Sequence, residues 1–231
     1  MIPIKGTMRK LENGISSNEI ISEEKNIKNL RNGYIALSMT IGMTIVGYLL
    51  GSTYLQGFAN MFSGGIGIIL FFAIFIPMIM AIEATQDSIV GLVLLLAFGV
   101  LKGVFLTPII GISETSTVVS AAIGTIAVSL GASVTAFNSK TDSSKWGGFL
   151  FFTLLGLIVA MLLNYFLFQS TLLQIGISSA VIVVMAFFMF RDVQRALYSK
   201  RANYISVALG FYISIINIFV NMLVLLGIAD D

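Results

Sequence analysis

Residues 32–82 read NGYIALSMTIGMTIVGYLLGSTYLQGFANMFSGGIGIILFFAIFIPMIMAI and contain no charged side chain. This stretch is too long for one membrane-spanning helix, because about 20 apolar residues cross the hydrocarbon core. Polar residues within 52–57 divide it, which predicts helices over 33–54 and 62–82. Membrane β-strands would alternate apolar and polar residues in segments of about 10, whereas these runs are apolar on all sides. The stretch therefore predicts a pair of transmembrane α-helices.

Five further apolar segments follow, each long enough to cross a bilayer. The expected spans cover 89–110, 116–136, two helices between 146 and 190 that meet at 169–171, and 204–228. The expected fold is an all-α polytopic membrane protein. A polar N-terminal tail, residues 1–32, precedes a seven-transmembrane-helix domain, residues 33–229.

The composition supports a membrane protein and gives no support for an enzyme. Hydrophobic residues make up 57% of the 231 and charged residues only 10%, against about 25% charged in soluble domains. The absence of His and Cys removes disulfides, thiolate nucleophiles and the usual zinc ligands. No phosphate-binding loop or nucleophile elbow occurs. We expect a lipid bilayer as surroundings, with no catalysis, no cofactor, no metal site and no nucleic acid.

The basic residues predict the orientation of the chain. Positively charged residues concentrate in cytoplasmic segments. With seven spans, twelve of the 13 Lys and Arg residues fall on the side of the N-terminus. We therefore expect a cytoplasmic N-terminus and an extracytoplasmic C-terminus. Within the tail, Ser16 and Glu19 fit a capping box. This predicts either a short helix lying on the membrane surface or, as the blander interpretation, a disordered tail.

Lys102 is the one basic residue inside a span. A central lysine costs about 2.5–3.5 kcal/mol on insertion scales and usually faces the bundle interior or a water-filled cavity. One interpretation is a gate or ion-pair partner inside the bundle. The other is a lysine whose amine reaches the outer headgroups. The sequence places no acidic residue at matching depth in another span.

Polar residues in the last two spans are the other candidates. Asp192 ends the sixth span, either as a solvated carboxylate beside Arg191 and Arg195 or as a proton-sensing group at a pore mouth. One face of the seventh span is polar, which predicts a central helix. That face either joins helices or lines a polar cavity. Its residues are Ser206, Gly210, Ser214, Asn217 and Asn221.

Several short segments carry a resemblance to a known family. They are LRNGY at 30–34, GVFLTP at 103–108, DVQ at 192–194, NYI at 203–205, SIINIF at 214–219 and LG at 226–227. In this order and in these spans, they resemble the Bax inhibitor family of seven-span membrane proteins. The chain looks similar in particular to its bacterial YccA-like branch, which modulates the membrane-anchored ATP-dependent protease FtsH.

The resemblance implies a bundle with the seventh helix near its centre. In calcium-leak members, two aspartates from the last two helices form a pH-sensing pair. Asp192 matches the first position, but Ser214 stands at the second. When two carboxylates share a site, the pKa of one of them is raised strongly, whereas a hydroxyl beside a carboxylate has no such effect. The resemblance therefore favours a modulator over a proton-gated leak.

We therefore expect a bacterial inner-membrane regulatory protein that binds and modulates a membrane-bound AAA protease. The alternative is a pH-sensitive calcium or cation leak channel, with Lys102, Asp192 and Asn217 near the path. A membrane hydrolase is a third class, but no nucleophile with a base and no metal site supports it.

Overall fold

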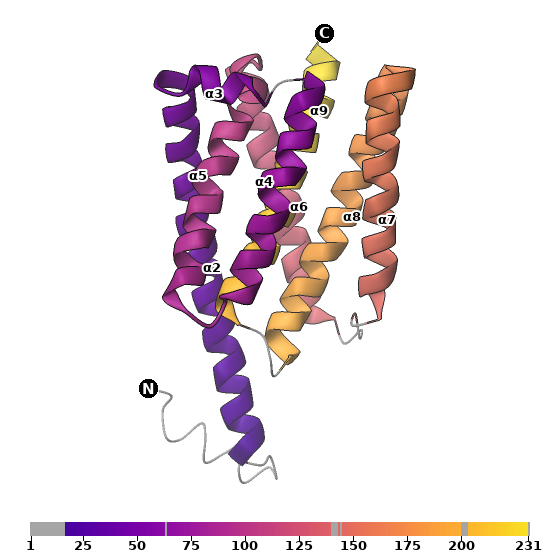
Figure 1. The fold of residues 1–231 in the computed structure, drawn as a ribbon. Helices are drawn as coiled ribbons and strands as arrows, with labels where there is room; N and C mark the ends of the chain where they lie inside the picture. Colours follow the sequence, from indigo (N-terminus) through magenta and orange to yellow (C-terminus); the bar gives the residue numbers. More distant parts are fainter. Residues whose placement is uncertain (1–16, 63, 140–142, 144, 200–202, 231) are drawn as a thin grey trace.

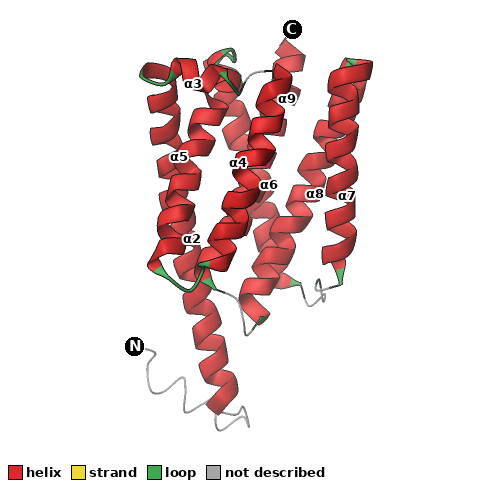
Figure 2. Cartoon of the chain, viewed as in Figure 1, coloured by secondary structure: helices red, strands yellow, loops and turns green. Residues whose placement is uncertain are grey.

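The computed structural model describes residues 17–62, 64–139, 143, 145–199 and 203–230. Helices account for nearly all of these residues (Figure 2). They are α2 (Ser17–Thr53), α3 (Gln56–Asn60), α4 (Gly64–Ala84), α5 (Ile89–Gly111), α6 (Thr115–Asn138), α7 (Trp146–Leu163), the π-helix η1 (Asn164–Phe168), α8 (Thr171–Tyr198) and α9 (Tyr204–Asp230).

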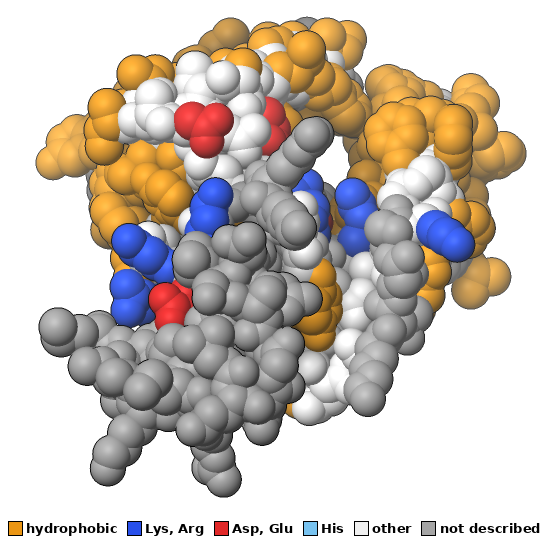
Figure 3. Space-filling view, turned by 90° about the horizontal axis from the view of Figure 1, so that it is seen from below, with side chains coloured by type: hydrophobic (Ala, Val, Ile, Leu, Met, Phe, Trp, Pro, Cys, Tyr) orange, Lys and Arg blue, Asp and Glu red, His pale blue; other side chains and the backbone are white. Residues whose placement is uncertain are grey.

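Seven helical segments are long and apolar enough to cross a membrane. They confirm the expected all-α, seven-span fold. The spans alternate in direction, so the N-terminus and the C-terminus lie at opposite ends (Figure 1). The α4–α5 turn, the C-terminal ends of α6 and α8 and the N-terminal ends of α7 and α9 lie at the end that α2 enters (Figure 1). Apart from Lys102, the described basic residues lie at this end too, where Figure 3 shows the Lys and Arg side chains.

Helix α9 lies at the centre of the bundle. It packs most extensively on α8, α2 and α6 and also contacts α4 and α5. Its residues Phe211 and Tyr212 are fully buried in the main hydrophobic core. The Tyr212 hydroxyl lies 2.7 Å from the hydroxyl of Thr44 in α2, which satisfies both groups inside the apolar interior.

The closest helix pairing joins α2 to α5 through glycine. A Cβ atom on Gly47 would overlap the backbone carbonyl of Val100, and one on Gly103 would overlap the carbonyl of Thr44. Without side chains, the two backbones approach each other directly. Such small residues are the usual means of close helix packing in membranes.

The N-terminal segment differs from expectation. Helix α2 includes residues 17–32, which were expected in the polar tail, so the boundary drawn between residues 32 and 33 falls inside a helix. The extension continues the axis of the first span beyond the bundle and does not turn along the membrane surface (Figure 1). Asn26 secures it, because its side-chain Nδ2 donates to the Leu197 carbonyl at 2.8 Å. The capping box at Ser16 and Glu19 lies outside the described side chains.

Two shorter features complete the fold. The break expected within 52–57 contains the additional short helix α3. At the other expected break, η1 ends at Phe168, and the next residue, Gln169, has a left-handed backbone with φ 48°. Helix α7 packs mainly on α8, so these two helices form a hairpin at one side of the bundle (Figure 1).

Candidate functional site

Asp192 lies at the lower end of the α8–α9 contact, directly against Gly210. A Cβ atom placed on Gly210 would lie 2.5 Å from the nearer carboxylate oxygen. Glycine is therefore required for this approach, because any other side chain would displace the carboxylate. The charged groups that act on Asp192 are Arg195, Arg191 and Glu83. Two cations and a second acid thus share this end of the bundle.

A hydrogen-bonded chain connects three helices beside Asp192. The Arg195 guanidinium in α8 donates to the hydroxyl of Ser206 in α9. The Ser206 hydroxyl donates in turn to Oε1 of Glu83, at the end of α4, over 2.8 Å. Ser206 is 3% exposed, so water does not compete freely for these bonds. We call Glu83, Asp192, Arg195, Ser206 and Gly210 the polar cluster.

A second link lies beside the polar cluster. The Asn203 side-chain nitrogen donates to Oδ1 of Asp87, in the α4–α5 turn, over 2.8 Å. Sequence reasoning found Asp192 and Ser206 but did not connect them with Glu83. Glu83, Asp192 and Ser206 come from three different spans. The one sequence signal for their contact was that the ends of these spans, two of them charged, lie at the same membrane face.

Lys102 occupies a separate place, between α5 and α4. It is 7% exposed, and its Nζ lies 4.1 Å from the ring centroid of Phe71 and 4.4 Å from that of Phe75. Phe105 and Phe98 are further away, at 5.6 and 6.0 Å. Ammonium groups are attracted to aromatic faces within about 6 Å. This aromatic cage favours the bundle-interior interpretation over a lysine that reaches the outer headgroups.

The three remaining candidates lie higher on α9. Ser214 is buried, with 2% exposure. The side-chain nitrogen of Asn217 donates to the Ile213 carbonyl at 2.7 Å, and that of Asn221 to the Asn217 carbonyl at 2.8 Å. Both amide groups therefore bond within α9 and do not join it to a neighbouring helix through these nitrogens. The structure thus brings Asp192 to the polar face of α9 and leaves Lys102 apart from it.

The fold and these sites define a class of protein, a polytopic α-helical membrane protein whose central helix carries a polar face. In the described chain, no group of three or more His, Cys, Asp or Glu residues could hold a metal ion. The family model "Inhibitor of apoptosis-promoting Bax1" matches residues 27–231. The chain therefore belongs to the Bax inhibitor family.

Bacterial relatives match nearly the whole chain. A Vibrio cholerae protein named "Uncharacterized membrane protein" is 31% identical over 209 residues, covering 88% of this chain and 91% of the relative. The Escherichia coli K12 "Modulator of FtsH protease YccA" is 27% identical over 212 residues, with coverage of 88% and 91%. An E. coli O6:H1 relative with the same identity and coverage is named "Inner membrane protein YccA". Together with the seven spans, these relatives indicate a multi-pass protein of the bacterial inner membrane.

Proposed function

We propose that the protein binds a membrane-anchored ATP-dependent protease and modulates its action on other membrane proteins. The observation that carries this proposal is the likeness to the relative named as a modulator of FtsH protease, which extends over 88% of this chain and 91% of that relative. The role is regulatory, and no catalytic step is assigned to this chain.

The polar cluster supports this choice over a pH-gated leak. Asp192 faces Gly210, and the buried residue one turn further along α9 is Ser214, which carries a hydroxyl. The other acid that acts on Asp192 is Glu83 of α4, and Arg195 and Arg191 act on it with the opposite sign. A leak gated by a pair of aspartates from the last two helices would need a carboxylate on α9, where Ser214 stands, and this supports the modulator.

The extension of α2 is the proposed contact region for the protease. It projects from the end of the bundle that carries the basic residues (Figures 1 and 3). Because basic residues mark the cytoplasmic side, we place this end and residues 1–32 in the cytoplasm and the C-terminus outside. The exposed residues Lys25, Ile27 and Lys28 would then face a protease domain that works from the cytoplasm.

A cation leak is the second candidate. It is favoured by the polar face of α9, where Asn217 and Asn221 are partly exposed at the depth of the spans. Polar side chains at that depth usually face the bundle interior or a hydrated cavity.

One pair of experiments separates the two candidates. A modulator should co-purify with the protease from native membranes, and its deletion should change the half-lives of other membrane substrates in a pulse-chase. A channel should move calcium in liposomes without any partner. We expect co-purification and little pH-dependent flux. Ser214→Asp should introduce or increase pH dependence by adding an acid on α9, one turn beyond Gly210, which faces Asp192. A large flux from the unmodified protein that switches sharply with pH, without protease binding, would contradict the modulator.

A further inference from the structure

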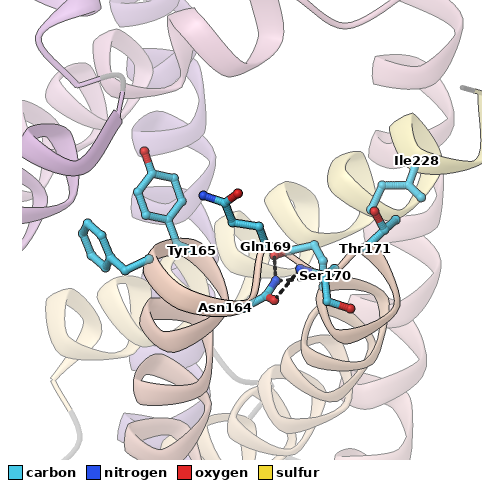
Figure 4. Close-up of a pocket in the computed structure, with 8 residues that line it drawn as sticks. Asn164, Tyr165, Gln169, Ser170, Thr171 and Ile228 are labelled. Atoms are coloured by element: carbon cyan, nitrogen blue, oxygen red, sulfur yellow. Dashed lines mark hydrogen bonds between the residues drawn. The ribbon is translucent and has the colours of Figure 1, made fainter.

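A cavity of about 520 Å³ lies at the end of the bundle opposite the polar cluster. It is an open pocket, bordered by the turn between α7 and α8 and by the last turn of α9 (Figure 4). It is distinct from the polar cluster and from the Lys102 cage. The residues that line it are Asn164, Tyr165, Phe166, Gln169, Ser170, Thr171, Gln174 and Ile228.

Asn164 holds the wall of this cavity in place. It is 4% exposed, its Nδ2 donates to the Ser170 carbonyl at 3.2 Å and its Oδ1 accepts from the Ser170 backbone N–H at 3.0 Å. The same Nδ2 lies 3.3 Å from Oε1 of Gln174. These bonds fix the turn, so Asn164 and Gln174 are already engaged. The groups left to meet a ligand come from the neighbouring residues.

Gln169 is held in an unusual position at the cavity. Its left-handed backbone is rare for a residue with a side chain, and such conformations concentrate at functional sites. In Figure 4 its amide extends from the turn on the same side as the Tyr165 phenol. An amide and a phenol each donate and accept hydrogen bonds. Thr171 adds a hydroxyl, at the first turn of α8, where backbone N–H groups lack intrahelical acceptors.

The chemistry of the lining defines the ligand. None of the eight lining residues is Asp, Glu, Lys or Arg, so a charged headgroup would find no counter-ion there. Amide and hydroxyl groups instead match a ligand that presents several uncharged hydroxyls.

The surroundings of the cavity indicate that this ligand is attached to a lipid. Gln169 and Ser170 lie between the fifth and sixth candidate spans, where the chain reaches the membrane surface. The adjacent side chains of Phe166, Leu167 and Leu172 are 56%, 69% and 80% exposed. Aromatic side chains such as Tyr165 favour this depth, where one end is apolar and the other hydrated. Acyl chains would cover these apolar groups, while a headgroup fills the cavity.

We propose that the cavity binds the uncharged, polyhydroxylated headgroup of a lipid from the leaflet on the C-terminal side, of the glycosyl-diacylglycerol type. Tyr165, Gln169 and Thr171 hydrogen-bond its hydroxyls, and Asn164 positions the turn. This site does not depend on the proposed interaction with a protease.

The test measures lipid binding to the purified full chain by native mass spectrometry in detergent. The probes are monoglucosyl-diacylglycerol, phosphatidylglycerol with the same acyl chains, and free methyl glucoside. We expect the glucolipid to bind, and to be retained more strongly than the other two. Preference for phosphatidylglycerol would overturn the uncharged ligand class, and equal binding of methyl glucoside would overturn the attachment to a lipid.

Variants locate the binding. Gln169→Gly removes the amide, and glycine adopts the left-handed backbone without strain, so the variant should fold. We expect it to bind the glucolipid about fivefold to tenfold more weakly, which corresponds to the loss of one or two hydrogen bonds. The matched control is Gln56→Gly in α3, at the same end of the bundle, where the amide donates to the Ser52 carbonyl of the preceding helix. Unchanged glucolipid binding by a folded Gln169→Gly protein would overturn the site.

Discussion

Gly210 and Asp192 depend on each other at the scale of single residues. A methyl group on Gly210 would occupy the position of the Asp192 carboxylate. Overpacking of this kind costs about 1–3 kcal/mol. Gly210→Ala should therefore lower the melting temperature, and Asp192→Ala in the same chain should restore much of the loss because it vacates the space.

A matched glycine provides the control for this prediction. Gly156 in α7 is exposed, and a Cβ atom there would meet no atom within 4 Å. Alanine at that position should leave stability unchanged or raise it by up to about 1 kcal/mol, since alanine favours the helix. Equal effects of the two substitutions would contradict the packing of Asp192 against Gly210.

Lys102 and its aromatic cage make a second prediction at this scale. A desolvated cation–π interaction is worth about 2 kcal/mol. In a double-mutant cycle of Lys102→Met and Phe75→Leu, thermal unfolding should report a coupling of about 1–2 kcal/mol. Pairing Lys102→Met with Ile69→Ala, a substitution on the exposed side of α4, should give additive effects. Additivity in both cycles would mean that the Lys102 ammonium does not interact with the Phe75 ring.

The sequence revealed these residues better than it revealed their partners. Lys102 and Asp192 stand out because each interrupts or ends an apolar run. The rings around Lys102 come from α4 as well as from its own helix, and Glu83 reaches Ser206 across 123 positions of sequence. Hydropathy reports depth in the membrane but not which faces of two helices meet, so these contacts could not be predicted.

At the scale of the helix, the extension of α2 rests on one buried amide. Asn26 is 7% exposed and bonds to the Leu197 carbonyl. Asn26→Ala should cost about 1 kcal/mol locally and loosen residues 24–32 from α8. Limited trypsin digestion should then cut faster at the exposed Lys25, Lys28 and Arg31.

The control for this prediction is another asparagine. Asn138 is exposed, and among the described residues its side-chain nitrogen donates to the Val134 carbonyl of its own helix. Asn138→Ala should leave the cleavage rate within α2 unchanged. Equal cleavage rates in wild type and Asn26→Ala would show that this amide does not hold the extension.

The helices show which kinds of element can be predicted in a membrane protein. All seven spans were predicted, because a bilayer requires long, uniformly apolar runs, although the first begins earlier than expected, at Glu24, and the sixth continues past residue 190 to Tyr198. For residues 17–32 a helix was only one of two interpretations, because these residues are polar and lie outside that constraint. Asn26 joins this segment to α8 through the Leu197 carbonyl, a tertiary contact that local composition does not reveal.

At the scale of the whole molecule, the orientation in the membrane can be tested by labelling. The chain contains no cysteine, so a single cysteine at Ser139 or after Asp231 reports one side only. We expect a membrane-impermeant maleimide to label the first from the cytoplasm and the second from outside. Labelling of both from the same side would contradict an odd number of spans.

The position of Lys102 also has a consequence for the synthesis of the protein. Ribosomes deliver the chain from its N-terminus, so α4, with Phe71 and Phe75, leaves the ribosome before α5. A helix with a central lysine enters lipid alone at a cost of about 2.5–3.5 kcal/mol. Only residues 85–88 separate the two helices, so the aromatic rings are already nearby when the lysine arrives. The cage thus favours release of α4 and α5 from the translocon as a pair, because the aromatic rings of α4 stabilise the charge on α5 in place of water.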